Sequence, residues 1–438
     1  MKEATATSVS LLEDFQKTRA LSLAIVEPLD PDDFNVAPIP EASPLKWHLA
    51  HTTWFFETFI LMAEAKHDAF HPQFGYLFNS YYKGLGDHLD RNRRVHLSRP
   101  NLKSVMQYRK DCDEKMAHLL GKQLPKLDPQ SQNRILSNLE VGIHHEMQHQ
   151  ELLITDLKSI LGLQPLLPSY FKNSSPRNAD PRSSLTRKWV RFEGALIETG
   201  FSGKGFHFDN EAPRYSNWVA PFEMSSTWVR NGEYLEFLKS KAYADPRKWL
   251  SDGWDRRPVA PMYWDLKNKS VYTLNGPVSM ADPLWLDSPV SHVSYFEADA
   301  YCRTHGARLP TENEWELAAT SNQVSRTQKH FLDVAPSEPQ SVGSTDVDRP
   351  LEITGQVWEW TQSAYLPYPG FKPQDGALGE YNGKFMINQM VLRGGSVATP
   401  RNHFRPTYRN FFPPATQWQF SGFRLARSID APTDRGQK

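Results

Sequence analysis

One segment constrains the fold more than any other feature of the sequence: a long amphipathic stretch that is polar at its centre. Residues 133–161 read NRILSNLEVGIHHEMQHQELLITDLKSIL, and the Asp128-Pro129 pair before them is typical of a helix start. The window HHEMQHQE lies in the middle of this otherwise apolar helix. Polar side chains that face a bundle core are costly to bury unless they are paired or bind a metal. The segment therefore predicts a helical bundle with a polar site inside it.

Three further segments have apolar residues at helical spacing. They are Leu11–Val26, the stretch LKWHLAHTTWFFETFILMAEA, and Leu102–Leu120. Ser43 is expected to cap the second helix, with Pro44 at its first position. Four long helices with a long connection between the second and the third favour a four-helix bundle, which we place at residues 1–165.

The rest of the chain predicts a second domain of a different kind. A length of 438 residues favours two domains over one core. Residues 166–187 are rich in Pro, Ser and Asn, so we expect a linker there, and residues 431–438 are expected to form a tail. Between them, residues 188–430 have short strands, frequent Gly and Pro, and helices near Tyr295–His305 and Glu312–Ala319. The predicted fold class is therefore α+β and multidomain.

Composition excludes several classes of protein. The 50 Lys and Arg balance the 50 Asp and Glu, which argues against a nucleic-acid binder or a membrane-surface protein. No apolar run approaches a membrane span, and the N-terminus lacks a signal pattern. With only Cys112 and Cys302, a disulfide framework is excluded and a cytoplasmic location is the default expectation. The sequence does not give the oligomeric state.

His145 and His149 are the first candidates for a metal site. They lie four residues apart, so they project from one face of the helix and can chelate one metal. Alternatively, they are solvated or packed histidines that share a helix by chance. A third ligand must come from elsewhere, and His48 and His51 on the second helix are candidates. His88 and other loop histidines are further candidates.

The same residues also match the H-E-x-x-H pattern of zinc hydrolases. In such enzymes the two histidines bind zinc and the glutamate, here Glu146, activates water. No downstream residue sits at a familiar third-ligand spacing, and the pattern is short enough to recur by chance. The zinc hydrolase nevertheless stays open as an alternative from another class.

Several long motifs resemble those of the bacterial sulfoxide synthases of ergothioneine biosynthesis. They are SPLKWHLAHTTWFFETF, YLFNSYY, HHEMQHQELLITD, FDNEAPRY, GARLPTENEWELAA, GQVWEWT and FSGFRLAR, in this order. The resemblance covers nearly the whole chain. It implies a DinB-like four-helix bundle followed by a C-type-lectin-like domain of the formylglycine-generating-enzyme (sulfatase-modifying-factor) type.

The resemblance also implies a cofactor and a reaction. Matching position by position, Fe(II) would be held by His51, His145 and His149. Three imidazoles leave open positions on the metal for substrates. The family joins the sulfur of cysteine to the imidazole C2 of hercynine (Nα-trimethylhistidine), using O2, to give hercynylcysteine sulfoxide. A γ-glutamylcysteine or selenium donor stays open as an alternative.

Further site residues follow from the same resemblance. Gln148 matches the residue that hydrogen-bonds the hercynine imidazole, and Asn410 and Phe411 match the positions that hold its carboxylate end and trimethylammonium. An aromatic face suits a quaternary ammonium, which cannot donate hydrogen bonds. Tyr81 and Tyr82 match the catalytic tyrosine pair of the cysteine-using subgroup, but the sequence does not say which one acts.

Departures from the family pattern concern the sulfur donor. Phe412 stands where relatives that use γ-glutamylcysteine carry Asp, which favours free cysteine. Arg91 and Arg94 are candidates to bind the donor's carboxylate, and His88 stands where Arg is common. Gln356 replaces a usual Asp.

The lectin-like domain raises an alternative activity of its own. Formylglycine-generating enzymes use a reactive cysteine pair in their C-terminal part, whereas residues 303–438 contain no cysteine. That activity is therefore not credible here, and a purely lectin-like binding module remains as a third alternative. We expect the domain to supply substrate-binding walls over the iron.

Overall fold

The computed structural model describes most of both predicted domains. The described residues are 2–171, 187–321, 331–333, 336–340, 353, 355–374, 377–380 and 382–429. Of the predicted linker 166–187, only 166–171 and 187 fall within these ranges, and the predicted tail 431–438 lies outside them.

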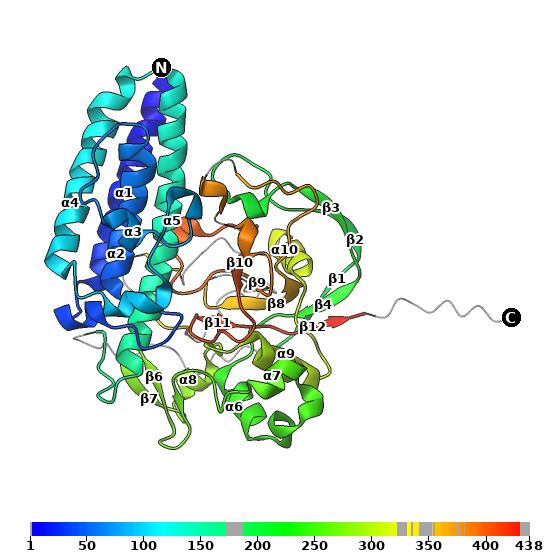
Figure 1. The fold of residues 1–438 in the computed structure, drawn as a ribbon. Coiled ribbons are helices and arrows are strands. Elements are labelled where there is room, and N and C mark those ends of the chain that lie inside the picture. The colour runs from blue at the N-terminus through cyan, green and yellow to red at the C-terminus, as the bar shows by residue number, and fades with distance from the viewer. Residues whose placement is uncertain are drawn as a thin grey trace.

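The N-terminal part is the predicted bundle of four long helices. They are α1 (Lys2–Val26), α2 (Leu45–Phe56), α4 (Leu102–His118) and α5 (Pro129–Gly162). Helix α1 packs on α5, and α2 packs on both α4 and α5, as Figure 1 shows. A short helix, α3 (Phe74–Phe78), lies in the long connection between α2 and α4. Along the described stretches, no helix combines the length and apolarity that crossing a membrane requires.

The start of α5 follows the capping rules, whereas the start of α2 does not. Asp128 Oδ1 accepts hydrogen bonds from the backbone N–H groups of Gln130 and Ser131, each at 3.0 Å, with Pro129 at the first position. The expectation that Ser43 caps α2 is wrong, because α2 begins at Leu45 and no side chain caps it. The backbone N–H of Ser43 instead donates to Asp156 at 2.9 Å. Ser43 is therefore held by a tertiary contact, although the local sequence predicts a helix cap at this residue.

Two helices end differently from their sequence pattern. After Phe56, α2 continues as a wider π-helical turn over Glu57–Met62, and α4 passes into a similar turn over Leu119–Gln123. Most apolar residues of these turns, namely Phe59, Ile60, Leu61, Leu119 and Leu120, are buried in the bundle core, whereas Met62 is exposed. Such turns change the angular spacing of side chains around the helix axis. A regular spacing of apolar residues in the sequence does not reveal this change.

The C-terminal part consists of small sheets and short helices. Among the described residues, the strands form the sheets β1-β4-β12, β10-β9-β8-β11, β2-β3 and β5-β6-β7. The strands are β1 (Trp189–Phe192), β2 (Ala195–Thr199), β3 (Tyr215–Val219), β4 (Phe222–Ser225), β5 (Trp264–Asp265), β6 (Ser270–Thr273), β7 (Gly276–Ser279), β8 (Trp358–Ala364), β9 (Met390–Arg393), β10 (Asn410–Phe412), β11 (Ser421–Gly422) and β12 (Ala426–Ser428). The helices are α6 (Asn231–Lys239), α7 (Ser251–Asp255), α8 (Pro283–Asp287), α9 (Tyr295–Thr304) and α10 (Glu312–Thr320). The helices predicted near Tyr295 and Glu312 are therefore present.

Buried ion pairs hold these irregular segments together. Arg424 donates to both carboxylate oxygens of Glu359 at 2.7 and 3.0 Å, and Arg409 does the same to Glu312 at 2.9 and 3.0 Å. Such two-pronged pairs fix orientation as well as distance. The first pair joins β8 to the segment that precedes β12, and the second fixes the start of β10, which carries part of the cleft described below, against α10.

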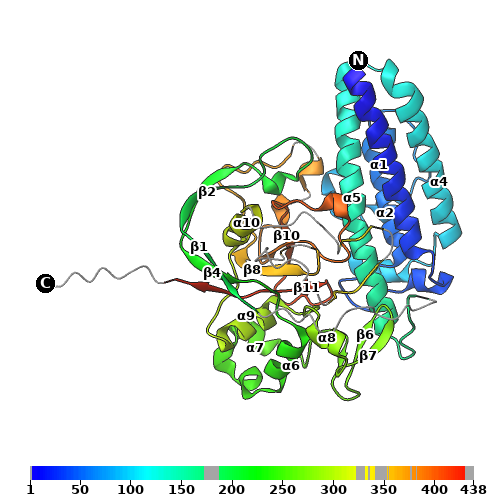
Figure 2. The same ribbon diagram turned by 180° about the vertical axis from the view of Figure 1, so that it is seen from behind.

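Helix α5 is the shared wall of the two domains. In Figures 1 and 2 it runs along the side of the bundle that faces the C-terminal domain. Glu151 accepts hydrogen bonds from Trp358 and Thr399, and Lys158 donates to Glu338 at 2.7 Å, all across this interface. The polar window of α5 is therefore positioned by both domains.

Candidate metal centre and substrate cleft

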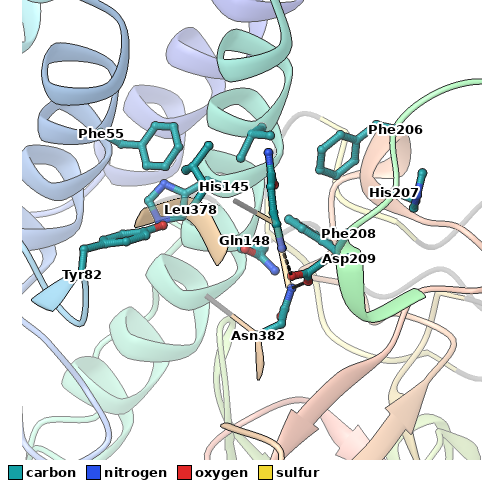
Figure 3. A pocket seen from close by; sticks show the side chains of 12 residues that line it. Phe55, Tyr82, His145, Gln148, Phe206, His207, Phe208, Asp209, Leu378 and Asn382 are labelled. Carbon is teal, nitrogen blue, oxygen red and sulfur yellow. Dashed lines mark hydrogen bonds between the residues drawn. The ribbon is translucent and has the colours of Figure 1, made fainter. Parts of the chain in front are cut away.

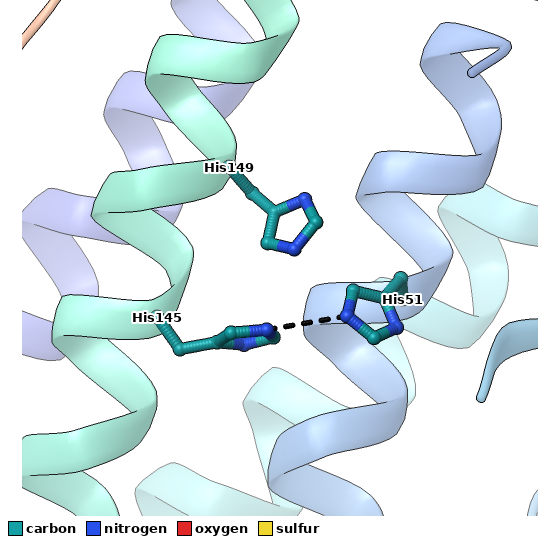
Figure 4. A group of neighbouring side chains, drawn as sticks. All are labelled: His51, His145 and His149. Atoms are coloured by element: carbon teal, nitrogen blue, oxygen red, sulfur yellow. Dashed lines mark hydrogen bonds between the residues drawn. The ribbon is translucent and has the colours of Figure 1, made fainter. Parts of the chain in front are cut away.

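Three histidines from two helices meet inside the bundle. His145 and His149 lie one turn apart on α5, and His51 faces them from α2 (Figure 4). His51 Nε2 lies 3.2 Å from His145 Nε2, and one ligand atom from each residue lies within 4.8 Å of the others. All three side chains are buried. The structure thus brings together the three predicted metal ligands.

The carbonyl oxygen of Phe78 fixes the tautomer of His51. It lies 2.5 Å from His51 Nδ1, which must carry the proton to donate this bond. The Nε2 lone pair then faces the other two histidines. The ring is also stacked on Trp47, with centroids 4.6 Å apart and planes 11° apart. His51 is therefore held in the ring orientation that a metal ligand needs.

A second set of hydrogen bonds orients His149. Its Nδ1 lies 2.8 Å from Nδ1 of His48, and Nε2 of His48 lies 2.8 Å from Oδ2 of Asp156. All donors and acceptors match when His149 Nδ1–H donates to His48 and His48 Nε2–H donates to Asp156. Trp418 of the C-terminal domain donates to the other carboxylate oxygen at 2.7 Å. The network leaves Nε2 of His149 for a metal and connects this ligand to both domains.

Burial keeps the three imidazoles neutral. It lowers the pKa of His145 to about 3, and it lowers the pKa of His51 and His149 well below the usual value, with a further lowering by neighbouring histidines. Neutral imidazole is the form that binds a metal. Three such nitrogens suit iron, zinc or copper, so the donor set fits a metal centre without selecting the metal.

The position of Glu146 speaks against the zinc hydrolase alternative. Its carboxylate accepts hydrogen bonds from Arg109 at 2.6 Å and Arg19 at 2.9 Å, and from the Ser22 hydroxyl at 2.6 Å. Burial alone would raise its pKa, but the two guanidinium groups lower it to about 2. The glutamate is thus a structural anion between α1 and α4, and it is not placed to activate water at the triad.

A cavity of about 550 Å³ lies beside the triad, between α2, α5 and the C-terminal domain. His149 lies in its wall. The wall also contains these predicted site residues: Tyr81, Arg91, Arg94, Gln148, Asn410, Phe411 and Phe412. Residues from three distant parts of the sequence therefore share one substrate-sized cleft next to the metal site.

The remaining predicted residues lie elsewhere. Tyr82 is buried and lines a second, much smaller cavity together with His145 (Figure 3). The two adjacent tyrosines thus reach different cavities. His88 is half-buried and lines neither cavity. Gln356 is buried, and its side-chain oxygen accepts a hydrogen bond from the backbone N–H of Gln340 at 2.9 Å, which gives it a structural role.

Arg94 places a desolvated cation at the cleft. Its guanidinium lies over the Trp47 ring at 3.5 Å and donates to the Ser43 hydroxyl at 3.0 Å. Burial, followed by the charge of Arg91, lowers the pKa of Arg94 to about 9, so it stays charged at neutral pH. A buried cation that borders a cavity is a natural site for a carboxylate.

The opposite wall of the cleft is polar and aromatic. Gln148 Nε2 donates to the Tyr408 hydroxyl at 2.8 Å, which orients the amide. Phe411 is stacked on Tyr365, with centroids 4.0 Å apart, and Phe412 packs edge-to-face on Trp418 at 5.2 Å. These rings are therefore held in place and present aromatic surface to whatever occupies the cleft.

Sequence reasoning missed the residues that orient the ligands. The sequence offers His48 only as a candidate ligand, and Asp156 and Trp418 are not among the candidates from sequence. Asp156 follows His149 by seven residues, two helical turns, and this spacing could have marked it. His144 lies away from the triad, where its Nδ1 is 3.0 Å from Nδ1 of His403.

Comparison with protein families confirms the predicted two-part fold. Residues 14–153 match the DinB superfamily, and residues 178–344 and 351–429 match the sulfatase-modifying factor enzyme 1-like domain. The chain therefore has a DinB-like helical bundle followed by a domain of the formylglycine-generating-enzyme, C-type-lectin-like kind.

Two hercynine oxygenases are similar to this chain over nearly its whole length, and a third relative is similar over about half of it. The chain is 30% identical over 422 residues to the hercynine oxygenase of Mycolicibacterium thermoresistibile, covering 90% of each protein. It is 29% identical to the hercynine oxygenase of Mycolicibacterium smegmatis, covering 96% of this chain and 99% of that one. Ergothioneine biosynthesis protein 1 of Schizosaccharomyces pombe is 26% identical over 51% of this chain and 28% of its own length.

Proposed function

This chain belongs to the hercynine oxygenase family, and from that premise we propose that it is an iron(II)- and O2-dependent oxidoreductase of ergothioneine biosynthesis. The reaction joins the sulfur of cysteine to the imidazole C2 of hercynine. The C2–H and S–H bonds are lost, a C–S bond forms, one oxygen atom of O2 enters the sulfoxide, and the other leaves as water. O2 is the only oxidant that this balance requires.

One observation carries the proposal. One cavity of about 550 Å³ is lined by His149 of the triad, by the desolvated guanidinium of Arg94 and by Phe411 of the polar and aromatic wall. A metal site, a carboxylate site and a site for a quaternary ammonium are the three features that this pair of substrates needs. A zinc hydrolase or a lectin-like binding module explains fewer of them.

The triad would hold the iron. Iron(II) on His51, His145 and His149 would supply O2 activation and would lower the pKa of the substrate thiol. The protein's own contribution is to keep these imidazoles neutral and oriented, as the bonds to Phe78 and His48 do. It also brings the two organic substrates together in one cleft, which lowers the entropic cost of their reaction.

Hercynine is proposed to lie along the wall made by α5 and β10. Gln148, oriented by Tyr408, would accept a hydrogen bond from the imidazole N–H. Asn410 would bind the carboxylate, and Phe411 would contact the trimethylammonium group. The stacking of Phe411 on Tyr365 fixes the ring for this contact.

The sulfur donor is proposed to be free cysteine, bound through its carboxylate by Arg94 and Arg91. Both residues line the cleft, and Arg94 is a buried cation next to it. The apolar ring of Phe412 in the same wall offers no polar group for a γ-glutamyl extension. His88 lies off the cleft, so we leave it out of the proposed donor site.

A tyrosine is proposed to donate a proton or hydrogen to the oxygen-derived group. Tyr82 shares its cavity with His145, whereas Tyr81 faces the large cleft and packs edge-to-face on Phe385 at 5.5 Å. Tyr82 is therefore the better candidate for the oxygen side of the reaction, and Tyr81 for the substrate side.

Two broader expectations stay proposals. We place the domain limits at residues 1–165 and 188–430. We also propose a cytoplasmic location, which the free thiols of Cys112 and Cys302 support.

The test is an anaerobic reconstitution with a panel of donors. Protein loaded with iron(II) receives hercynine, O2, and one of cysteine, γ-glutamylcysteine or selenocysteine, and the products are identified by mass spectrometry. We expect hercynylcysteine sulfoxide, with cysteine preferred. An Arg94→Met variant should raise the KM for cysteine, while an Arg93→Met variant, changed at an exposed neighbour, should leave it unchanged.

The possible outcomes separate the parts of the proposal. A preference for γ-glutamylcysteine or the selenium compound would contradict the donor assignment alone. No product with any donor, while iron is bound, would contradict the proposed reaction.

A further inference from the structure

The small cavity is a separate approach to the triad. It has a volume of about 30 Å³ and reaches His145, whereas the large cleft reaches His149. Gln148 and Asn382 line both cavities and stand between them. Gln148 is hydrogen-bonded to Tyr408 at 2.8 Å. Asn382 is hydrogen-bonded to Asp209 at 2.5 Å (Figure 3), so both residues of the partition are held in place.

The small cavity extends from solvent to the metal site. His207 and Gln374, at one end of its lining, are exposed. At the other end His145 is 3% exposed, Tyr82 is 1% and Phe55 is 0%. Its lining therefore spans the distance from the surface to a proposed metal ligand.

Size and polarity limit what this cavity can take. Its volume admits one or two water-sized molecules and excludes an amino acid. Half of the lining residues are apolar or aromatic, and they include the two buried residues next to His145, Phe55 and Tyr82; the others of this half are Val141, Phe206, Phe208 and Leu378. A small, uncharged and apolar molecule fits the inner part beside Phe55 and Tyr82, because a polar molecule there would find few hydrogen-bond partners.

The proposed reaction requires such a molecule. If hercynine and the thiol fill the large cleft, they stand between solvent and the metal on the side of His149. A third substrate then needs another path to the metal. The inference rests on the proposed function at this point, because only that function places two organic substrates in the cleft.

We propose that the small cavity is the site through which O2 reaches the metal, from the side of His145 and separately from the organic substrates. Tyr82, buried in the same cavity, would be the first protic side chain that O2 meets beside His145. This arrangement would let O2 enter after both organic substrates are bound.

Val141 allows a direct test. It lies one turn before His145 on α5, is half-buried, and of the two cavities lines the small one, so Val141→Phe should fill it. Leu152→Phe is the matched control, because Leu152 is a half-buried residue of the same helix that lines only the large cleft. Leu378→Phe, from the opposite wall, serves as a second blocking variant should Val141→Phe not fold.

The main measurement needs no turnover. Nitric oxide, a diatomic that binds ferrous iron, is mixed anaerobically with iron-loaded protein saturated with hercynine and cysteine, and its association is followed by stopped-flow absorbance. A blocking variant should slow nitric oxide association several-fold. In a separate steady-state assay, the same variant should raise the KM for O2 by a similar factor without changing the KM for hercynine. Leu152→Phe should raise the KM for hercynine and leave nitric oxide association unchanged.

The outcomes are distinct from those of the proposed function. Slower nitric oxide association in either blocking variant supports the route, and unchanged association in both overturns it. Xenon under pressure should occupy the small cavity in crystals of the unmodified protein, and an empty cavity there would also count against the route. An absence of sulfoxide product would contradict the proposed function. The nitric oxide and xenon results would still show whether a small molecule reaches the metal through this cavity.

Discussion

Replacing Asp156 by Asn should weaken metal binding although Asp156 does not touch the metal site. Its carboxylate accepts hydrogen bonds from His48 at 2.8 Å, from Trp418 at 2.7 Å and from the Ser43 backbone N–H at 2.9 Å. Asparagine offers only one oxygen, so its amide N–H group must face a donor. The negative charge that makes His48 a better acceptor for His149 is also lost.

The expected magnitude follows from the role of such partners in metal sites. Loss of a group that orients a metal-binding histidine lowers metal affinity by about 10- to 100-fold, or about 1.4 to 2.7 kcal/mol. The assay is an anaerobic titration of iron(II) against a competing chelator. Circular dichroism and urea unfolding of each variant show whether the fold is kept.

Glu151→Gln is the matched control for Asp156→Asn. Glu151 is also a buried carboxylate of α5, and its hydrogen bonds from Trp358 and Thr399 lead to the C-terminal domain rather than to the triad. Its variant should keep normal iron affinity. Unchanged affinity in Asp156→Asn would refute the reasoning. An equal loss in both variants would show that a loosened domain interface, rather than the His48–Asp156 connection, causes the effect.

Three further predictions concern the cleft, the bundle core and pH. Arg94→Met should raise the KM for the thiol substrate about 10- to 100-fold, the value of a charge-assisted hydrogen bond, without changing the KM for hercynine in steady-state assays. Gly142→Ala should destabilise the protein by about 1 to 3 kcal/mol in urea unfolding, because a Cβ there would lie 2.5 Å from a ring carbon of the buried Phe56; equal or greater stability would contradict this. Burial raises the pKa of Glu297 to about 7 from an ordinary 4.5, so its neutral form stabilises the fold at low pH and this contribution is lost as the pH rises from about 4.5 through 7. Glu297→Gln should remove roughly 3 kcal/mol of that pH dependence, measured as unfolding free energy at several pH values, and an identical pH profile would contradict the assignment.

The fold was predictable where the sequence pattern is periodic. The four long helices follow from apolar residues at helical spacing, and the start of α5 follows from Asp128 and Pro129. The start of α2 was not predictable, because Ser43 is engaged by Asp156, more than a hundred residues away. Nor does local sequence show the π-helical turn after Phe56, where the packing of the bundle overrides the regular helix.

The candidate site divides in the same way. The spacing of His145 and His149 gave a pair of ligands, but His51 came from family resemblance, and only the structure places the three together. The direction of Glu146 depends on Arg19 and Arg109 from two other helices, so the H-E-x-x-H pattern alone could not reject a hydrolase.

The residues that complete the site come from tertiary structure. His48 and Asp156 meet only because α2 packs on α5. Trp418 and Tyr408 enter the site only because the C-terminal domain docks on that helix. No local pattern in the sequence marks such contacts.

The central claim is that three histidines hold one iron. The most direct test is metal analysis after anaerobic loading with iron(II), comparing the unmodified protein with His51→Ala and with His118→Ala, an exposed histidine of α4. We predict one iron per chain in the unmodified protein and in His118→Ala, and loss of bound iron in His51→Ala with the fold kept. Full retention of iron by His51→Ala, or an absence of bound iron in the unmodified protein, would contradict the account.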